Sequence, residues 1–439
     1  MVRCWLEIKF LFPLLILVIA GCSSSQKTVQ KGKSINQLIS KSVIFNNHFT
    51  GFSLYDPASN KFIINKNEDK YFTPASNTKI ITLFAALKNL PSVLPSYKFV
   101  ETESEILVKG MGDPTFLHPL WQNHPGLDKL VNSPKAISMV SDQFQDNKLG
   151  AGWAWDDYNE DYQAEVNDFP IYGNLVEFKY DSSQSSFLTI PVYFKDKWYW
   201  NMKSPMNYKI FRKVDMNEFI VDTSLRKNYI LPFRTDPTVL GAALQDTLKK
   251  KVSLISGNMV SIDSWQIQPG VEIDSVYAQM MKVSDNFIAE QLILSIGSYT
   301  SDTIHTTYVL NKLKKQLFDT MPPFQWFDGS GLSRYNLITP KHLIHILNYI
   351  YLTKGVEWIK KIFPSGGESG TIKNSYKGNP TYVYAKTGSL MNNHSLSGYL
   401  RAKSGKWYIF SFMHSNYTGS VLPIRQEMQK TLEYIRDHF

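Results

Sequence analysis

Three short polar motifs, far apart in the chain, constrain how this sequence can fold. They are Ser76-Asn-Thr-Lys79, Ser284-Asp-Asn286 and Lys386-Thr-Gly388. Ser76 and Lys79 open an apolar run, Ile80 to Leu87, that predicts a helix, and a spacing of three places both side chains on one helix face. A serine hydroxyl becomes a nucleophile when a neighbouring base takes its proton. The first motif therefore predicts a Ser76 nucleophile with Lys79 as its base.

Lys79 can act as a base only when it is neutral. A free lysine has a pKa of about 10.4, so burial or a nearby cation must lower it. If the three motifs converge on one cleft, Lys386 is the cation that disfavours protonation of Lys79. Ser284 would then bridge Lys79 to the departing amine and return the proton. Asn286 would donate its amide to a substrate carbonyl and hold Lys79.

The third motif predicts how a peptide end is held. Lys386 and Thr387 suit a terminal carboxylate. The preceding residues 381–385 are typical of a strand, and Gly388 lets a peptide backbone lie flush against that strand. Backbone N–H groups would hold the oxyanion. Ser76 and Ser389 are the expected donors, each worth about 3 to 4 kcal/mol.

The N-terminus predicts export. Residues 1–21 carry Arg3 and Lys9, then an apolar run too short to span a bilayer, as in a secretory signal peptide. The ending Ile19-Ala-Gly-Cys22 resembles the bacterial lipoprotein cleavage box, so Cys22 is the expected lipidation site. Cys4 leaves with the signal, and no disulfide remains possible. An ordinary signal peptide with a stray cysteine is the alternative. Residues 22–40 are polar and predict a flexible, lipid-anchored tether.

The secondary-structure pattern predicts an α+β fold. Strands are expected at 49–55, 62–65, 396–401 and 407–413, and a helix at 423–439. Strands from both ends of the chain can share one antiparallel sheet with helices on its faces. Residues 41–91 and 269–439 would form the catalytic acyl-transferase domain. Residues 92–268, rich in aromatics and turns with one clear helix at 237–251, predict one or two β-rich inserted domains.

Composition narrows the choice of partners. The net charge of +9 is scattered, whereas nucleic-acid binding needs a clustered basic stripe, so only mild attraction to an anionic polymer or membrane surface is expected. No His-x-x-Glu-His pattern or Cys/His cluster occurs, which argues against a zinc peptidase, and we expect no cofactor or metal. Aromatic residues, at 14%, are expected mainly in cores rather than on sugar-facing surfaces.

Several polar and aromatic residues near the motifs receive structural interpretations. Asp113 and Asp328 lie in Gly/Pro loops and are expected to cap turns. Asp285 and His394 are expected to be structural. The pair Trp153 and Trp155 could stack on a glycan, although core packing is favoured.

Together these motifs resemble the class C low-molecular-mass penicillin-binding proteins, which are D-alanyl-D-alanine carboxypeptidases and endopeptidases; β-lactamases of class A share the trio. The resemblance covers nearly the whole mature chain. It extends to Gly112-Asp-Pro114, Trp155-Asp-Asp-Tyr158, Asp328-Gly-Ser-Gly-Leu-Ser333 and the long insert, although this insert is slightly short. It implies a penicillin-recognising serine acyl-transferase fold, with a helical lobe beside the sheet.

The resemblance implies cleavage of peptidoglycan stem peptides ending in D-Ala-D-Ala through a Ser76 acyl-enzyme, which β-lactams would also form. A lipid-anchored location on the periplasmic side of the cell envelope is expected. One alternative is a β-lactamase, but no second carboxylate motif is placed to activate water. The other is a non-catalytic wall-binding or sensor protein, against which the complete motifs argue. The sequence does not indicate the oligomeric state.

Overall fold

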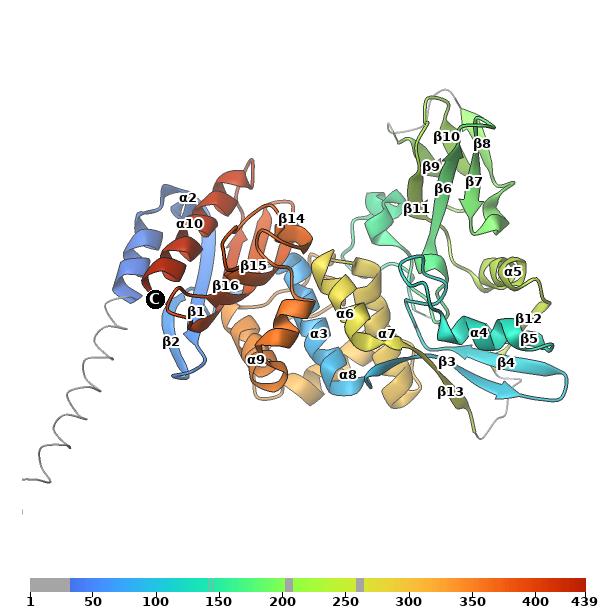
Figure 1. Ribbon diagram of the computed structural model, residues 1–439, viewed down its shortest axis with the longest axis horizontal. Coiled ribbons are helices and arrows are strands. Elements are labelled where there is room, and N and C mark those ends of the chain that lie inside the picture. Colours follow the sequence, from blue (N-terminus) through green and yellow to red (C-terminus); the bar gives the residue numbers. More distant parts are fainter. Residues whose placement is uncertain (1–31, 142, 145, 202–207, 258–263) are drawn as a thin grey trace, which may run out of the picture. The chain divides into compact units, whose positions relative to one another are not determined.

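The computed structural model describes residues 32–439 apart from 142, 145, 202–207 and 258–263 (Figure 1). Two compact units divide the chain, and each is described by itself. Unit 1 comprises the described residues up to Phe72, with Ile338–Lys360 and Pro364–Phe439. Unit 2 comprises Thr73–Leu337 and Lys361–Phe363. The predicted signal peptide and Cys22 lie outside the described residues.

A five-stranded antiparallel sheet forms the centre of unit 1. Its strands, in spatial order, are β14 (Val383–Leu390), β15 (Asn393–Arg401), β16 (Trp407–Ser415), β1 (Phe49–Asp56) and β2 (Lys61–Lys66). Phe49 pairs with Ser415, and Leu54 pairs with Phe410. The expected sheet built from both ends of the chain is therefore confirmed. The strand expected at 381–385 instead runs through Lys386, so the third motif lies within β14.

Helices cover both faces of this sheet. Helices α10 (Leu422–His438) and α2 (Val43–Asn46) pack with one face through a buried apolar cluster that includes Leu396 and Leu400 of β15. Successive strand residues point to opposite faces, and the neighbouring Tyr399 donates its hydroxyl to the carbonyl of Leu347 in α9 (Pro340–Ile362). Helix α9 therefore lies against the other face.

Residues 32–41 are helical, which contradicts the prediction of a flexible tether over residues 32–40. Ile35 and Ile39 are 0% exposed and belong to the same apolar cluster as Leu396. Their spacing of four places them on one helix face. The mainly polar composition of this segment concealed the four-residue spacing of its isoleucines. Two isoleucines on one face are nevertheless enough to anchor a short helix to a core.

Unit 2 contains a helical group around α7. Its members are α3 (Thr78–Asn89), α6 (Ile273–Lys282), α7 (Asn286–Ser301) and α8 (Thr306–Phe318). Helix α7 is buried along most of its length and packs against the other three. The helix predicted after Ser76 is confirmed as α3. The division differs from the expected one, because this helical group, expected in the catalytic domain with the sheet, clusters with the insert.

The insert is β-rich, as predicted, and its last strand pairs with its first. Strand β13 (Gln266–Glu272) pairs antiparallel with β3 (Val93–Glu101), with Glu272 opposite Val93. Its five-stranded sheet has the order β12 (Val252–Ile255), β5 (Ala136–Val140), β4 (Glu105–Gly110), β3 and β13. Two three-stranded sheets have the orders β8 (Trp198–Asn201), β10 (Phe219–Asp222), β9 (Ile210–Arg212), and β11 (Tyr229–Pro232), β6 (Leu175–Asp181), β7 (Ser186–Ile190).

The insert also has helices and short 3-10 turns. The predicted helix is α5 (Pro237–Leu248), which Asp236 caps by accepting from the Val239 N–H. Sequence reasoning missed α4 (Pro125–Asn132), which is only eight residues long. The 3-10 turns described beyond the site are η2 (Trp155–Asn159), η3 (Asp161–Gln163), η4 (Tyr172–Asn174), η5 (Val192–Phe194) and η8 (Gly370–Ile372).

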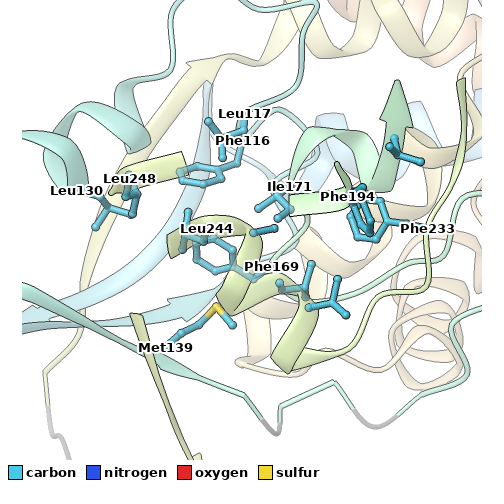
Figure 2. Packing of buried hydrophobic residues seen from close by; sticks show 14 of the residues in the cluster. Phe116, Leu117, Leu130, Met139, Phe169, Ile171, Phe194, Phe233, Leu244 and Leu248 are labelled. Atoms are coloured by element: carbon cyan, nitrogen blue, oxygen red, sulfur yellow. The ribbon is translucent and has the colours of Figure 1, made fainter. Parts of the chain in front are cut away.

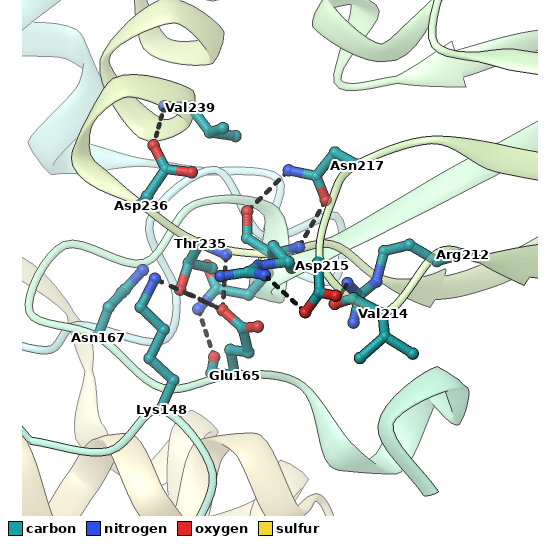
Figure 3. A network of polar contacts seen from close by, with 12 residues as sticks. Lys148, Glu165, Asn167, Arg212, Val214, Asp215, Asn217, Thr235, Asp236 and Val239 are labelled. Atoms are coloured by element: carbon teal, nitrogen blue, oxygen red, sulfur yellow. Dashed lines mark hydrogen bonds and ion pairs between the residues drawn. The ribbon is translucent and has the colours of Figure 1, made fainter. Parts of the chain in front are cut away.

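An aromatic core and a buried carboxylate hold the insert together. Figure 2 shows Phe116, Phe169, Phe194 and Phe233 in one buried cluster, which explains much of the aromatic content. Beside it, Glu165 accepts hydrogen bonds from the backbone N–H and the hydroxyl of Thr235, at 2.7 and 2.9 Å (Figure 3).

Across the described ranges, we find no helix with both the length and the apolar character needed to span a bilayer.

The buried N-terminal helix makes a stability prediction. Ile39→Ala should lower the free energy of unfolding by about 2 to 4 kcal/mol, because it leaves a cavity in the core of unit 1. Asn36→Ala, on the exposed face of the same helix, is the matched control and should have little effect. Denaturant unfolding of both variants measures the difference. Equal stabilities would mean that residues 32–41 behave as a tether after all.

Candidate active site

Ser76 and Lys79 meet at the start of the first helix in unit 2. Ser76 lies in the 3-10 turn η1 (Ala75–Asn77), which leads directly into α3. The preceding Ala75 has a φ of 49°, a left-handed conformation uncommon for alanine. The Lys79 Nζ lies 3.1 Å from the Ser76 Oγ. The contact predicted from the three-residue spacing is therefore present.

Three oxygens surround the Lys79 amino group, whose side chain is 0% exposed. Besides the Ser76 Oγ, Nζ contacts Asn286 Oδ1 at 2.6 Å and the Ser330 carbonyl at 2.7 Å. An ammonium can donate to all three oxygens. A neutral amine can donate to Asn286 and Ser330 and accept the hydroxyl proton of Ser76. The arrangement accommodates lysine in both protonation states.

Burial lowers the pKa of Lys79 to about 8, and the charges of Asp328, Glu290 and Asp285 oppose this shift. The sequence left burial or a nearby cation as the possible cause, and burial is the largest one: removal of the ammonium from water disfavours the charged form.

The second motif positions Asn286 through helix capping. Asp285 is the N-cap of α7 and accepts from the Ile288 N–H at 3.0 Å, which confirms its structural interpretation. Ser284, just before the cap, has a φ of 67°. The Asn286 amide nitrogen also donates to the Tyr162 carbonyl at 2.9 Å, so the orientation of its side chain is set from both ends.

A buried loop, residues 328–333, supplies the carbonyl that contacts Lys79. Asp328 accepts from the backbone N–H groups of Gly331 and Ser333 at 2.9 and 2.6 Å, so its expected turn-capping role is confirmed. Trp153, expected in a core, is partly buried, and its indole N–H donates to Asp328 at 2.9 Å. Its neighbour Trp155 is 78% exposed, contrary to the expectation of core packing.

Glu290 is a buried residue beside the site that sequence reasoning missed. Its two carboxylate oxygens accept from the N–H groups of Gly329 and Ser330 at 2.9 and 2.7 Å. Glu290 follows Asn286 by four residues, and this spacing places both on one face of α7. The four-residue spacing from Asn286 was the sequence signal that could have identified Glu290. It was missed because the other buried positions of α7 are mainly apolar and give no reason to expect a buried acid.

In unit 1, the third motif lies on β14. Lys386 is buried and donates to the Thr387 carbonyl at 2.8 Å, and the Thr387 hydroxyl donates to Thr371 at 2.7 Å. The exposed Ser389 has its hydroxyl 2.8 Å from His394 Nδ1. Burial, with a smaller contribution from Arg425, lowers the pKa of His394 to about 3, so this imidazole is neutral at physiological pH.

Ser76, Lys79, Ser284 and Asn286 thus belong to unit 2, whereas Lys386, Thr387, Gly388 and Ser389 belong to unit 1. The structure brings Ser76, Lys79 and Asn286 into direct contact. Within the described part of the chain, no group of three or more His, Cys, Asp or Glu side chains could hold a metal ion.

The sheet, the helices and the serine–lysine pair define a penicillin-recognising serine acyl-transferase fold. Penicillin binding protein 4 from Haemophilus influenzae is similar, with a TM-score of 0.71 and 19% identity over 92% of this chain and 99% of that one. A predatory endopeptidase from Bdellovibrio bacteriovorus, solved with an immunity protein, has a TM-score of 0.51 at 16% identity, over 87% and 92% of the two chains. Both likenesses concern the fold.

The particular family follows from the sequence match. The model of the D-Ala-D-Ala carboxypeptidase 3 (S13) family matches residues 32–434, and this chain belongs to that family of serine-type hydrolases. A penicillin-sensitive carboxypeptidase A from Dictyostelium discoideum is 25% identical over 416 residues, covering 79% of this chain and 77% of the relative. The carboxypeptidase DacB from Haemophilus influenzae is 32% identical over 158 residues, 33% and 32% of the two chains.

Close packing at Gly331 makes a prediction about the loop. Gly331 has a φ of 88°, and a Cβ there would overlap the carbonyl oxygen of Ala75. Gly331→Ala should therefore shift the loop and slow D-alanine release from a peptide ending in D-Ala-D-Ala. It should also destabilise the fold by more than the roughly 1 to 2 kcal/mol of a left-handed residue.

Gly405→Ala is the matched control, because Gly405 has a φ of 85° but no atom within 4 Å of its would-be Cβ. The control should incur only the backbone cost and retain activity. Unfolding curves and product release measure both variants. Equal effects at the two glycines would contradict the role of the Ala75 contact.

Proposed function

We propose that this enzyme cleaves D-Ala-D-Ala ends of peptidoglycan stem peptides through an acyl-enzyme on Ser76, and that β-lactams acylate the same serine. The observation that carries the proposal is the buried Lys79, whose Nζ lies 3.1 Å from the Ser76 Oγ. Membership of a D-Ala-D-Ala carboxypeptidase family supports the choice of substrate.

Lys79 is proposed as the general base. With a pKa of about 8, a fraction of Lys79 is neutral near pH 7 and can accept the Ser76 proton as Oγ attacks the carbonyl carbon. Asn286 and the Ser330 carbonyl would hold the ammonium that forms. Ser284 would relay that proton to the departing D-alanine amine. Water would then hydrolyse the ester and release Ser76.

The third motif is proposed to bind the substrate end. Lys386 and Thr387 would hold the terminal carboxylate, and Gly388 would lie against the substrate backbone. Backbone N–H groups of Ser76 and Ser389 would stabilise the oxyanion. These roles rest on the motif and the family rather than on a distance, although β14 is an edge strand of its sheet, where an extended peptide can add.

Cleavage of cross-links between stem peptides is proposed as a second activity of the same site. A solved structure with this fold is named a predatory endopeptidase. The reaction would use the same acyl-enzyme on Ser76, and only the group that leaves would differ.

The proposed chemistry predicts a covalent adduct. The full chain, purified in detergent and incubated with benzylpenicillin, should gain the mass of one drug molecule, and Ser76→Ala should gain none while it stays folded. Intact mass spectrometry measures this directly. Hydrolysed drug without an adduct would favour a β-lactamase. Intact drug without an adduct would favour a non-catalytic wall-binding or sensor protein.

We further propose that the enzyme is exported and anchored by lipid on Cys22, on the periplasmic side of the cell envelope. The apolar run before Ile19-Ala-Gly-Cys22 supports export with lipidation. Cys22→Ser should move the protein from the membrane fraction to the soluble fraction of the envelope, as followed by immunoblot. Membrane retention of this variant would refute the lipid anchor.

A further inference from the structure

We propose that Glu290 is a positioning residue for the reaction, because its carboxylate fixes the peptide whose carbonyl holds Lys79. The inference rests on the function proposed for Ser76 and Lys79. It deepens that function by assigning control of the base to a residue outside the three motifs. Glu290 acts through the loop and does not itself touch Ser76 in the contacts described.

A short chain of contacts links Glu290 to Lys79. Its carboxylate accepts from the N–H groups of Gly329 and Ser330, and the Ser330 carbonyl accepts from Lys79 Nζ at 2.7 Å. No side chain intervenes between the Glu290 carboxylate and that backbone segment. A shift of the carboxylate therefore moves a direct partner of the proposed base.

The same segment is held tightly from two helices. The Thr82 hydroxyl of α3 donates to the Gly329 carbonyl at 2.6 Å. On the side of α7, a Cβ at Gly329 would overlap the Ala289 carbonyl oxygen. The loop thus lies between α3, which carries Lys79, and α7, which carries Glu290 and Asn286. This packing leaves the backbone little freedom once both hydrogen bonds are made.

The charge of Glu290 also acts on Lys79. The charged groups that face Lys79 in unit 2 are the carboxylates of Asp328, Glu290 and Asp285, and each raises the pKa of Lys79 against the effect of burial. Burial and Asp328 raise the pKa of Glu290 to about 8, so Glu290 is charged in the upper part of the pH range over which Lys79 loses its proton. Neutralising Glu290 should therefore leave Lys79 deprotonated at lower pH.

The test is the pH dependence of benzylpenicillin acylation, measured by quenched mass spectrometry on the full chain. In the wild type, the rate should rise with pH to a half-maximum near the Lys79 pKa of about 8. Glu290→Gln removes the charge and one acceptor, so the half-maximum should move to lower pH, and the plateau rate should fall. Glu290→Asp keeps the charge, so only the plateau should fall.

Two further variants separate charge, loop position and general stability. Thr82→Val disturbs the same loop without changing a charge, so it should lower the plateau at an unchanged half-maximum. Lys314→Met changes a cation that lines the same 320 Å³ cavity as Glu290 and Asp328 but makes no described contact with residues 329–330. It should leave the profile as in the wild type.

An unchanged half-maximum in Glu290→Gln, with only a lower melting temperature, would reduce Glu290 to a structural residue and overturn the inference. If that variant does not fold, the decision passes to Thr82→Val, whose unchanged plateau would equally overturn it. Absence of any Ser76 adduct in the wild type would instead refute the proposed function, so the two failures are distinguishable.

Discussion

The burial of one amino group, that of Lys79, is the constraint on which the rest of the site depends. A lysine removed from water must be surrounded by polar partners, because an unpaired buried charge is strongly unfavourable. Ser76, Asn286 and the Ser330 carbonyl meet this need and come from three separate segments of the chain. The requirement to satisfy Lys79 therefore determines where α3, α7 and the loop at 328–333 must meet.

Left-handed backbone conformations occur beside these partners. Ala75 and Ser284 adopt left-handed conformations next to Ser76 and Asn286, and Gly331 does so in the loop. Each left-handed non-glycine residue costs about 1 to 2 kcal/mol, and such residues persist where surrounding contacts over-determine them. Here those contacts include the N-cap of Asp285 and the hydrogen bonds of Asp328. The strain thus coincides with the groups whose exact direction matters for proton transfer.

Two buried acids, Asp328 and Glu290, hold the loop whose carbonyl contacts Lys79. Asp328 folds the loop on itself, and Glu290 attaches that loop to α7. Both carboxylates favour the ammonium form of Lys79, whereas burial favours the amine. A base with a pKa near the working pH is the most effective proton acceptor, and the balance between burial and these charges brings Lys79 close to that condition.

The three motifs, the α+β class, the sheet shared by both ends of the chain and the β-rich insert could all be predicted from the amino-acid sequence. Spacing and periodicity are local properties, and they predicted the contact between Ser76 and Lys79. Three features required the folded chain: burial is the main cause of the lowered pKa of Lys79, Ile35 and Ile39 anchor a helix, and Glu290 holds the loop. Burial depends on what packs around a side chain, and that information is distributed over segments far apart in the sequence.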